Sequence, residues 1–336
     1  MRLSDAIYVA GHTGLLGSAL VRRLQAMGYS NLLLPLHRDL DLSDAAAVHG
    51  FFARERPRYV FLAAAKVGGI LANCSFPADF IFENLRIQTN VIHESSRSAV
   101  ERLVFTGSSC IYPKLGRQPL REDSLLTGPL EFTNRPYAVA KIAGIEMCWA
   151  YNRQYKSSFL VAMLTNLYGP GDNYHPTDSH LIPALIRRMH EAKLSGAHEV
   201  VVWGSGSPWR ELLYSDDAAD ACIFLMNLPE EQFTTLVNTG EFPPLVNVGS
   251  GVEMPIREIA DLIAQVVGFE HKLAYDSARP DGTQRKLMDT SRLNALGWRS
   301  RTRLVEGLRK TYADFCSRIT ETSDSGNWNN RTLILK

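Results

Sequence analysis

The fold can be predicted from two adjoining segments, Ala6-Ile-Tyr-Val-Ala10 and Gly11-His-Thr-Gly-Leu-Leu-Gly17. The short apolar run predicts a buried strand, and the leucine and valine residues at positions 15, 16, 20, 21 and 24 predict a helix. Glycines let a backbone approach a pyrophosphate closely, and a helix N-terminus offers it free N–H groups. This GxxGxxG spacing therefore predicts a dinucleotide-binding loop, with a plain tight strand-to-helix turn as the alternative.

The order of strand and helix repeats after this turn. Apolar runs predict strands at 32–34, 59–62, 103–105 and 159–164, and helices are expected near 43–54, 78–100 and 137–155. Strands that alternate with helices predict a parallel sheet covered on both faces. We therefore expect an α/β fold with a Rossmann-type doubly wound sheet.

The clean alternation ends past residue 165, where glycine and proline turns become frequent. We expect residues 1–170 to form the cofactor-binding Rossmann domain, with a return of the chain to it around 211–250. Residues 171–316 are expected to form mainly the substrate domain, a smaller C-terminal α/β lobe with strands at 200–203 and 245–248 and a helix at 256–267. The polar segment 317–336 is expected to be a loose tail.

Composition excludes several classes of function. The 36 basic and 35 acidic residues leave a net charge of +1 and form no basic block, so neither nucleic acid nor a membrane is expected as a partner. There is no run of eighteen apolar residues and no secretion signal, which predicts a cytoplasmic protein. The five cysteines form no close pair and are expected to be reduced thiols, and the nine histidines show no metal-ligand spacing.

The residues after the second predicted strand indicate the cofactor. Enzymes that use NAD place an acidic residue there to bind the ribose 2′-hydroxyl, whereas a cation accommodates the 2′-phosphate of NADP. His37 and Arg38 stand near this place, so NADP(H) is favoured. A solvated surface cluster is the alternative, because Asp39 and Asp41 lie close by.

Tyr137 and Lys141 lie four residues apart, on one face of a predicted helix. A nearby ammonium favours the phenolate and lowers the pKa of a tyrosine, which can then protonate an alkoxide that forms from a ketone. A tyrosine and a lysine with this spacing often occur by chance on the surface of a helix. Ser108, however, follows a strand of the same predicted sheet, and residues beyond the carboxyl ends of such strands border the ligand crevice.

Together, GxxGxxG, Ser108 and the YxxxK pair resemble the extended short-chain dehydrogenase/reductases. Within that family the chain is similar to the GDP-L-fucose synthase group, in blocks that cover nearly everything from Ile7 to about Phe315. The blocks that carry the resemblance are 63–69, 107–114, 137–144, 165–170, 173–176, 179–180, 200–206 and 279–283.

The resemblance implies an activity and a set of catalytic residues. Members of the group convert GDP-4-keto-6-deoxy-D-mannose to GDP-L-fucose by epimerising C3 and C5 and then reducing C4 with NADPH. Ser108, Tyr137 and Lys141 match the reductase residues, and Cys110 and His180 match the base and the acid of the epimerisation. Taken alone, a cysteine at a strand end is more often a small buried hydrophobe, and a loop histidine more often a structural donor.

The resemblance also implies binding residues and a homodimer. The group's glycine loop often carries an arginine where Thr13 stands, so the preference for NADPH depends on His37 and Arg38. The expected cofactor-binding residues are Gly11, Thr13, Gly14, Leu15, Leu16, Gly17, His37, Arg38, Asp41, Ala64, Lys141, Asn166, Leu167 and His180. The expected residues for the GDP-sugar substrate are Arg188, Trp203, Arg210 and Asp281.

Two alternatives remain open. The chain resembles relatives that act on other GDP-4-keto-deoxy sugars, in the GDP-colitose or GDP-6-deoxy-heptose pathways. The presence of both Cys110 and His180 argues against a pure reductase, which needs neither. A non-catalytic NADP(H)-binding module is the remote alternative, and the intact Ser108, Tyr137 and Lys141 set argues against it.

Overall fold

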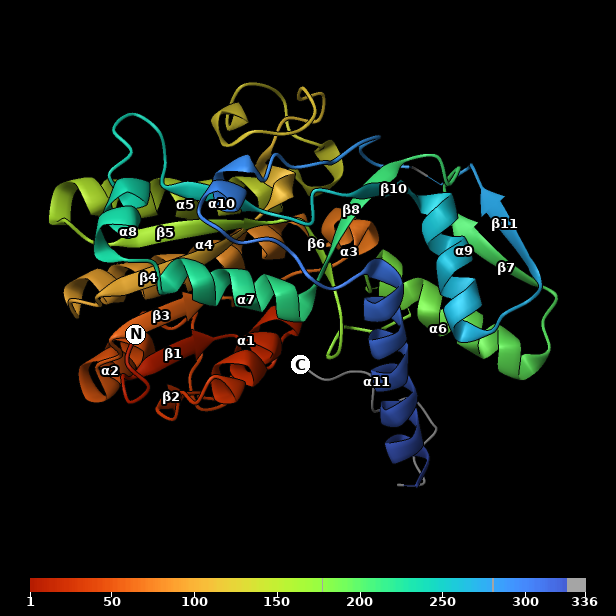
Figure 1. Cartoon of the computed structure of the whole chain (residues 1–336), viewed down its shortest axis with the longest axis horizontal. Helices are drawn as coiled ribbons and strands as arrows, with labels where there is room; N and C mark the ends of the chain where they lie inside the picture. The colour runs from red at the N-terminus through yellow and green to blue at the C-terminus, as the bar shows by residue number, and fades with distance from the viewer. Residues whose placement is uncertain (177, 280, 325–336) are drawn as a thin grey trace.

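A computed structural model describes residues 1–176, 178–279 and 281–324, with side chains as far as residue 320. Its larger lobe contains a parallel sheet with the strand order β2-β1-β3-β4-β5-β9 (Figure 1). These strands are β1 Ile7–Ala10, β2 Leu32–Leu33, β3 Tyr59–Leu62, β4 Arg102–Ser108, β5 Phe159–Leu164 and β9 Leu245–Val248.

Helices cover both faces of this sheet because its strands are apolar on both sides. Ile7 and Val9 pack on one face against helices α1, α7 and α8, whereas Tyr8 and Ala10 pack on the other against α2, α4 and α5. The expectation of a doubly wound sheet is confirmed. These helices are α1 Leu15–Ala26, α2 Ala45–Glu55, α4 Pro77–Arg97, α5 Arg135–Tyr155, α7 Ser215–Met226 and α8 Glu230–Val237.

The strand order changes direction between β1 and β3. From β1 the chain moves outward to β2, and it then returns past β1 to β3, β4 and β5. In open α/β sheets, ligands bind beyond the carboxyl ends of the strands at such a switch point. The glycine loop after β1 and Ser108 at the end of β4 therefore belong to the same edge of the sheet.

The smaller lobe is built from two short sheets and three helices. One sheet has the order β10-β8-β6, and the other pairs β11 with β7. Its strands are β6 Asn166–Tyr168, β7 Glu199–Trp203, β8 Trp209–Tyr214, β10 Glu253–Pro255 and β11 Lys272–Asp276. Its helices are α6 Leu181–Ser195, α9 Ile256–Val267 and α11 Leu304–Asp324 (Figure 1). These three helices share one apolar core.

Short elements join these parts. They are the helices α3 Ile70–Ser75 and α10 Ser291–Ala295, and three single turns at Ser109–Ile111, Glu122–Ser124 and Phe132–Asn134. Strand β9 pairs in parallel with β5 in the first sheet.

One local expectation differs from the structure, at the end of the chain. The tail expected from residue 317 is helical as far as Asp324, because α11 continues with apolar residues on its inner face. Leu308 and Phe315 are buried there, and Ile319 packs against the same core. The rest of the tail, 325–336, lies outside the described residues. Within the described part of the chain, no helix is long and apolar enough to cross a membrane.

Candidate active site

The glycine loop brings the start of α1 close to the end of β1. Gly11 has φ +82°, and a Cβ there would lie 2.7 Å from the Cα of Ala64. A Cβ on Gly17 would lie 1.9 Å from the carbonyl oxygen of Gly11. Only glycine fits at these two positions, so the loop leaves the first N–H groups of α1 accessible to an anion. Gly14 stands at the N-terminal cap of α1 and is exposed, as is Thr13.

The residues expected to select the cofactor lie after β2, the strand beside β1. His37 and Arg38 are exposed, and Nε of Arg38 lies 3.8 Å from an Asp39 oxygen. Asp41 accepts a hydrogen bond of 2.8 Å from the backbone N–H of Ser43, which holds the pKa of that carboxyl below its usual value. Both side chains are thus accessible to a phosphate at this edge.

Ser108, Tyr137 and Lys141 come from two neighbouring elements. Ser108 is the last residue of β4, and Tyr137 and Lys141 stand in the first two turns of α5. The Lys141 ammonium is buried and donates a 2.9 Å hydrogen bond to the carbonyl oxygen of Thr106. It also lies 5.9 Å from the centre of the Tyr137 ring, so the structure places the three residues together.

The expected lowering of the Tyr137 pKa is wrong for the protein alone. Burial raises the pKa of Tyr137, and a nearby Cys110 thiolate would raise it further. The physical reason is that Lys141 donates to Thr106 rather than to the phenol. Burial lowers the pKa of Lys141 to about 8, against the opposing attraction of Cys110. Tyr137 is therefore a neutral donor of a proton at neutral pH.

Cys110 lies in the single turn that follows β4, beside the reductase residues. Its thiol is buried, and it interacts with the Ser108 hydroxyl, with Lys141 and with Tyr137. Burial raises its pKa, and the positive charges of Lys286 and Lys141, with the Ser108 hydrogen bond, oppose that rise. The surroundings therefore do not lower the pKa of Cys110 on balance, because desolvation of the thiolate outweighs the two cations.

His180 caps the N-terminus of α6 from the smaller lobe. The loop before it is held close to the larger lobe, since Gly69 donates its N–H to Asp178 and a Cβ on Gly69 would lie 2.9 Å from the carbonyl oxygen of Ser179. The imidazole is exposed on the surface, yet crowding by the protein around it lowers its pKa, with Lys286 as the second cause. His180 and Cys110 thus share Lys286 as a neighbour.

Asn166 and Leu167 begin β6, directly after β5 leaves the large sheet. The Asn166 amide donates a 3.0 Å hydrogen bond to the carbonyl oxygen of Glu211. Leu167 is half-buried against the core that also packs α1. Their position beyond the carboxyl end of a central strand is consistent with the predicted place in the cofactor crevice.

The residues expected for the GDP end form two groups in the smaller lobe. In the first, the Arg188 guanidinium donates to the carbonyl oxygen of Val201 at 2.7 Å and lies 5.5 Å from the centre of the Trp203 ring. Arg279 lies 5.0 Å from the same ring, which is 47% exposed. Arg279 was not predicted, although it stands in one of the resembling sequence blocks.

In the second group, Arg210 and Asp281 stabilise the loop that leads out of β11. Arg210 donates to the carbonyl oxygens of Thr283, at 2.7 Å, and Asp281, at 3.1 Å. The Asp281 carboxylate accepts from the backbone N–H of Ser205 at 2.7 Å and from the Ser205 hydroxyl at 2.8 Å. Both of its oxygens are therefore engaged within the protein, and its contact with a substrate stays a prediction.

Lys286 is a second residue near the site that the sequence did not predict. It is half-buried and interacts electrostatically with Cys110, with Arg210 and with Glu131. It belongs to none of the motifs. Its only signal in the sequence is its place next to Arg285, directly before the apolar pair Leu287 and Met288 and shortly after a resembling block.

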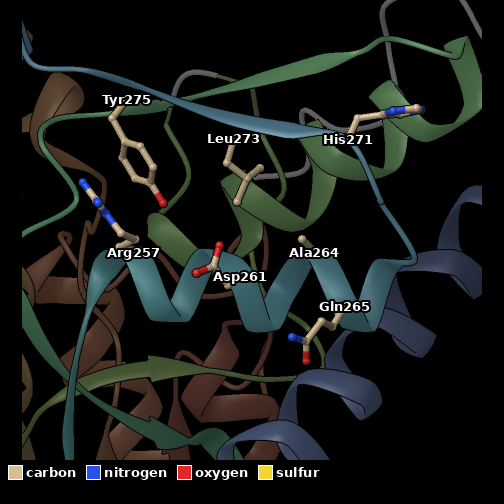
Figure 2. Close-up of a pocket in the computed structure, with 7 residues that line it drawn as sticks. All are labelled: Arg257, Asp261, Ala264, Gln265, His271, Leu273 and Tyr275. Carbon is tan, nitrogen blue, oxygen red and sulfur yellow. The ribbon is translucent and has the colours of Figure 1, made fainter.

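Figure 2 shows a separate hollow on the smaller lobe, between α9 and β11. Its lining residues are Arg257, Asp261, Ala264, Gln265, His271, Leu273 and Tyr275. None of the predicted catalytic or binding residues lines it. The described residues also contain no group of three or more side chains suited to hold a metal ion.

Comparisons with known proteins agree with this geometry. A model of the NAD dependent epimerase/dehydratase family matches residues 7–240. GDP-L-fucose synthase 1 of Arabidopsis thaliana is 56% identical over 309 residues, which cover 92% of each chain. GDP-L-fucose synthase of Escherichia coli (strain K12) is 52% identical over 309 residues, covering 92% of this chain and 96% of that protein.

Among solved structures, a GDP-mannoheptose C4 reductase from Campylobacter jejuni with NADP bound is 38% identical and has a TM-score of 0.85. The match covers 94% of this chain and 99% of that one. The resemblance to GDP-L-fucose synthases is confirmed by the two curated relatives. The chain belongs to the NAD dependent epimerase/dehydratase family.

Proposed function

We propose that this protein converts GDP-4-keto-6-deoxy-D-mannose to GDP-L-fucose with NADPH, by epimerising C3 and C5 and then reducing the C4 ketone. One observation carries the proposal. The Cys110 thiol lies beside Ser108 and Tyr137 at the end of β4. A group that can remove a proton from carbon therefore borders the groups that can protonate an alkoxide. Two relatives that are named GDP-L-fucose synthases are 52% and 56% identical to the chain.

The residues at the first switch point fit NADP(H). The glycine loop would hold the pyrophosphate on the N-terminus of α1, because no Cβ fits at Gly11 or Gly17. His37 and Arg38, exposed at the end of β2, would bind the 2′-phosphate. When bound, NADPH supplies the hydride for the reduction of C4.

Tyr137 and Ser108 act on the C4 oxygen of the sugar. A hydroxyl that donates to a carbonyl oxygen stabilises the negative charge that develops there. Tyr137 is a neutral phenol and can give its proton to the C4 alkoxide. Lys141, whose pKa falls to about 8, supplies a positive charge 5.9 Å from the Tyr137 ring, which stabilises the phenolate that results.

Cys110 and His180 act at the carbons next to the ketone. C3 and C5 both lie beside C4, so removal of a proton from either carbon gives an enolate whose charge lies on the C4 oxygen. The Cys110 thiolate takes that proton, and His180 gives a proton to the opposite face of the same carbon. The same hydroxyls of Ser108 and Tyr137 then stabilise the oxyanion in all three steps.

The smaller lobe would bind the GDP end. Arg188 and Arg210 suit a diphosphate because guanidinium groups donate paired hydrogen bonds to phosphate oxygens. Burial lowers the pKa of both groups. Trp203, which is partly exposed between two arginines, would cover an apolar face of the nucleotide.

The proposal includes a homodimer in the cytoplasm. Helices α4 and α5 lie side by side and expose apolar side chains, among them Phe82 at 59% and Val139 at 42%. Apolar residues gathered on an outer helical layer support an interface between two copies. The five free cysteines are consistent with a reducing compartment. Light scattering on Phe82→Glu would test the dimer, with a halved mass as the expected result.

The activity is tested by incubating the protein with GDP-4-keto-6-deoxy-D-mannose and NADPH. We expect one NADPH oxidised per sugar and GDP-L-fucose as the product. A reduced sugar with its original configuration at C3 and C5 would contradict the epimerase part of the proposal. NADPH binding without oxidation of NADPH would contradict the whole, and would instead favour a binding module.

A further inference from the structure

Lys286 stands in an extended segment that is hydrogen-bonded on both sides of it. Gln284 accepts a 2.8 Å hydrogen bond from the N–H of Trp209, in β8. On the other side, Leu287 donates to the Gln118 amide oxygen at 3.0 Å and accepts from the N–H of Leu120 at 2.7 Å. The backbone at Lys286 is therefore held between strand β8 and the loop around Gln118.

Neighbouring side chains of this segment point to opposite sides. Arg285 is exposed and donates from Nε to Glu253 of β10 at 2.6 Å, on the outer side. Lys286 lies on the other side, two residues before the buried Met288, which packs in the same core as Cys110. Its charge acts on Cys110 across this core. Successive side chains in an extended chain alternate between two faces, so the fixed backbone determines that Lys286 points inward.

The Lys286 side chain is not engaged by another side chain or by the backbone in the described residues. The Lys286 ammonium makes no hydrogen bond or ion pair within the parts of the chain that the structure describes. The groups that face it are Cys110, Arg210 and Glu131, and Glu131 is itself paired with Lys114 at 2.9 Å. Burial of an ammonium without a partner costs free energy. A negative charge that develops close to Lys286 would therefore be stabilised by it.

Cys110 needs such a positive charge. Burial alone raises the pKa of this thiol, and the groups that face it are Lys286, Lys141, Ser108 and Tyr137. Lys141 already donates to Thr106, whereas Lys286 is the first of the charged groups that oppose the effect of burial on Cys110. The same ammonium also acts on His180.

We infer that Lys286 is a positioning residue for the epimerisation, whose ammonium stabilises the Cys110 thiolate. In this step the thiolate takes a proton from C3 or C5, the thiol forms, and the electron pair of the C–H bond moves into the enolate with its charge on the C4 oxygen. Lys286 touches neither reacting carbon in this account. It acts through Cys110, and it also makes the His180 imidazolium readier to release its proton.

The inference predicts a displaced pH profile. Loss of the Lys286 charge raises the pKa values of both Cys110 and His180, so the rising and falling limbs of the epimerisation rate both move to higher pH. An opposite charge at close range lowers a pKa by about one to three units, so the rising limb moves up by about that much. On that limb, each unit reduces the rate about tenfold.

The experiment measures uptake of deuterium from solvent at C3 and C5 against pH, at saturating sugar, for Lys286→Met, Lys286→Gln and Lys286→Arg. We expect both limbs to move up in the Met and Gln variants and to return towards the original positions in the Arg variant. The matched control is Arg285→Met, which removes the neighbouring but outward charge and should leave the profile in place. NADPH binding checks that each variant is folded.

Two results would overturn the inference. The first is an unmoved profile in both neutral variants with only a raised KM, which would assign Lys286 to binding of the diphosphate. The second is an equal displacement in Arg285→Met, which would assign the effect to net charge rather than to position.

The inference depends on the proposed role of Cys110, and a separate variant distinguishes the two. If Cys110→Ser keeps deuterium uptake, the role of Cys110 fails whatever the Lys286 variants do. If Cys110→Ser loses uptake while the profile of Lys286→Met does not move, only the role of Lys286 fails.

Discussion

Lys141 donates a 2.9 Å hydrogen bond to the carbonyl oxygen of Thr106, so a residue of α5 is tied to the strand that ends in Ser108. The contact holds the ammonium below the Tyr137 ring rather than against its hydroxyl. It also joins the two elements that carry the reductase residues. The relative placement of Ser108, Tyr137 and Lys141 therefore depends on a buried contact between a side chain and the backbone.

Tyr137→Phe removes the proposed proton donor. We expect the rate of NADPH oxidation with the keto sugar to fall by about a hundredfold to ten-thousandfold, because general acid catalysis contributes about that much. Binding of NADPH, measured by fluorescence, should change little. The matched control is Tyr151→Phe on the same helix, where the hydroxyl contacts His93 instead, and it should keep full activity. Normal oxidation of NADPH by Tyr137→Phe would refute the assignment.

Cys110→Ser replaces the thiol by a hydroxyl, which is a far weaker acid and does not form the required base near neutral pH. We expect deuterium uptake at C3 and C5 to be lost, while the protein still binds NADPH and unfolds near its original temperature. Cys74→Ser, at an exposed thiol, serves as the control and should behave as the unmodified protein. Unchanged uptake in Cys110→Ser would exclude the thiol as the base.

His37→Ala combined with Arg38→Ala tests the choice of cofactor. Each charge-assisted hydrogen bond to a phosphate contributes about 1.5–3 kcal/mol, so we expect the preference for NADPH over NADH to fall by at least about tenfold. The measurement is the ratio of kcat/KM for the two cofactors. Arg54→Ala, at an exposed arginine paired with Glu55, is the control. A ratio that stays constant in the double variant would place the 2′-phosphate elsewhere.

Gly17→Ala and Gly14→Ala separate close packing in the glycine loop from cofactor binding. A Cβ on Gly17 would overlap the Gly11 carbonyl oxygen at 1.9 Å, whereas one on Gly14 would meet that atom at an ordinary 3.5 Å. Overpacking of this kind costs about 1–3 kcal/mol. We expect Gly17→Ala to lower the free energy of unfolding without cofactor by that amount, measured in urea. Gly14→Ala should stay near the original value, and equal losses would contradict the packing account.

Asp172 provides a pH-dependent test of stability. Its side chain is buried with one oxygen unpartnered, and burial raises its pKa from 3.8 to about 7. The folded state therefore binds the proton more tightly than the unfolded state does, so the protein loses stability as the pH rises from about 4 to about 7. Asp172→Asn removes this dependence. We expect the variant to gain stability relative to the original protein across that range, by up to about 4 kcal/mol above pH 7.

The control for Asp172 has the opposite sign. Hydrogen bonds from Ser291 hold the pKa of Asp289 below its usual value, so ionised Asp289 stabilises the fold at neutral pH. Asp289→Asn should therefore lower stability at pH 7, and the loss should fade as the pH falls below the usual carboxyl value of 3.8. Unfolding in urea at several pH values measures both variants. A gain for Asp172→Asn that is the same at pH 4 and pH 8 would contradict the assigned pKa.

The sequence predicted the doubly wound sheet well because its strands are apolar on both faces and its helices follow a regular period. It predicted Cys110 and His180 only through the resemblance, since neither residue belongs to a local pattern. The end of α11 was missed because Phe315 and Ile319 pack against α6 and α9, which lie far away in the sequence. Local polarity at the end of the chain gave no sign of that contact.

Lys286 and the pKa of Tyr137 could not be predicted for a related reason. The Lys286 charge acts on Cys110 because the segments around Trp209 and Gln118 hold the Lys286 backbone, and these contacts join residues far apart in the chain. The pKa of Tyr137 depends on burial and on the direction of the Lys141 ammonium, whereas a helical spacing of four gives only proximity. Spacing along a helix predicts which side chains lie close together, whereas their burial determines whether they are charged.

The most direct test of the account is the position of deuterium in the product formed from GDP-4-keto-6-deoxy-D-mannose and NADPH in heavy water, measured by NMR. We expect GDP-L-fucose with deuterium at both C3 and C5, because both protons pass through groups that exchange with solvent. A reduced sugar without deuterium at either carbon would show that this site does not both epimerise and reduce its substrate.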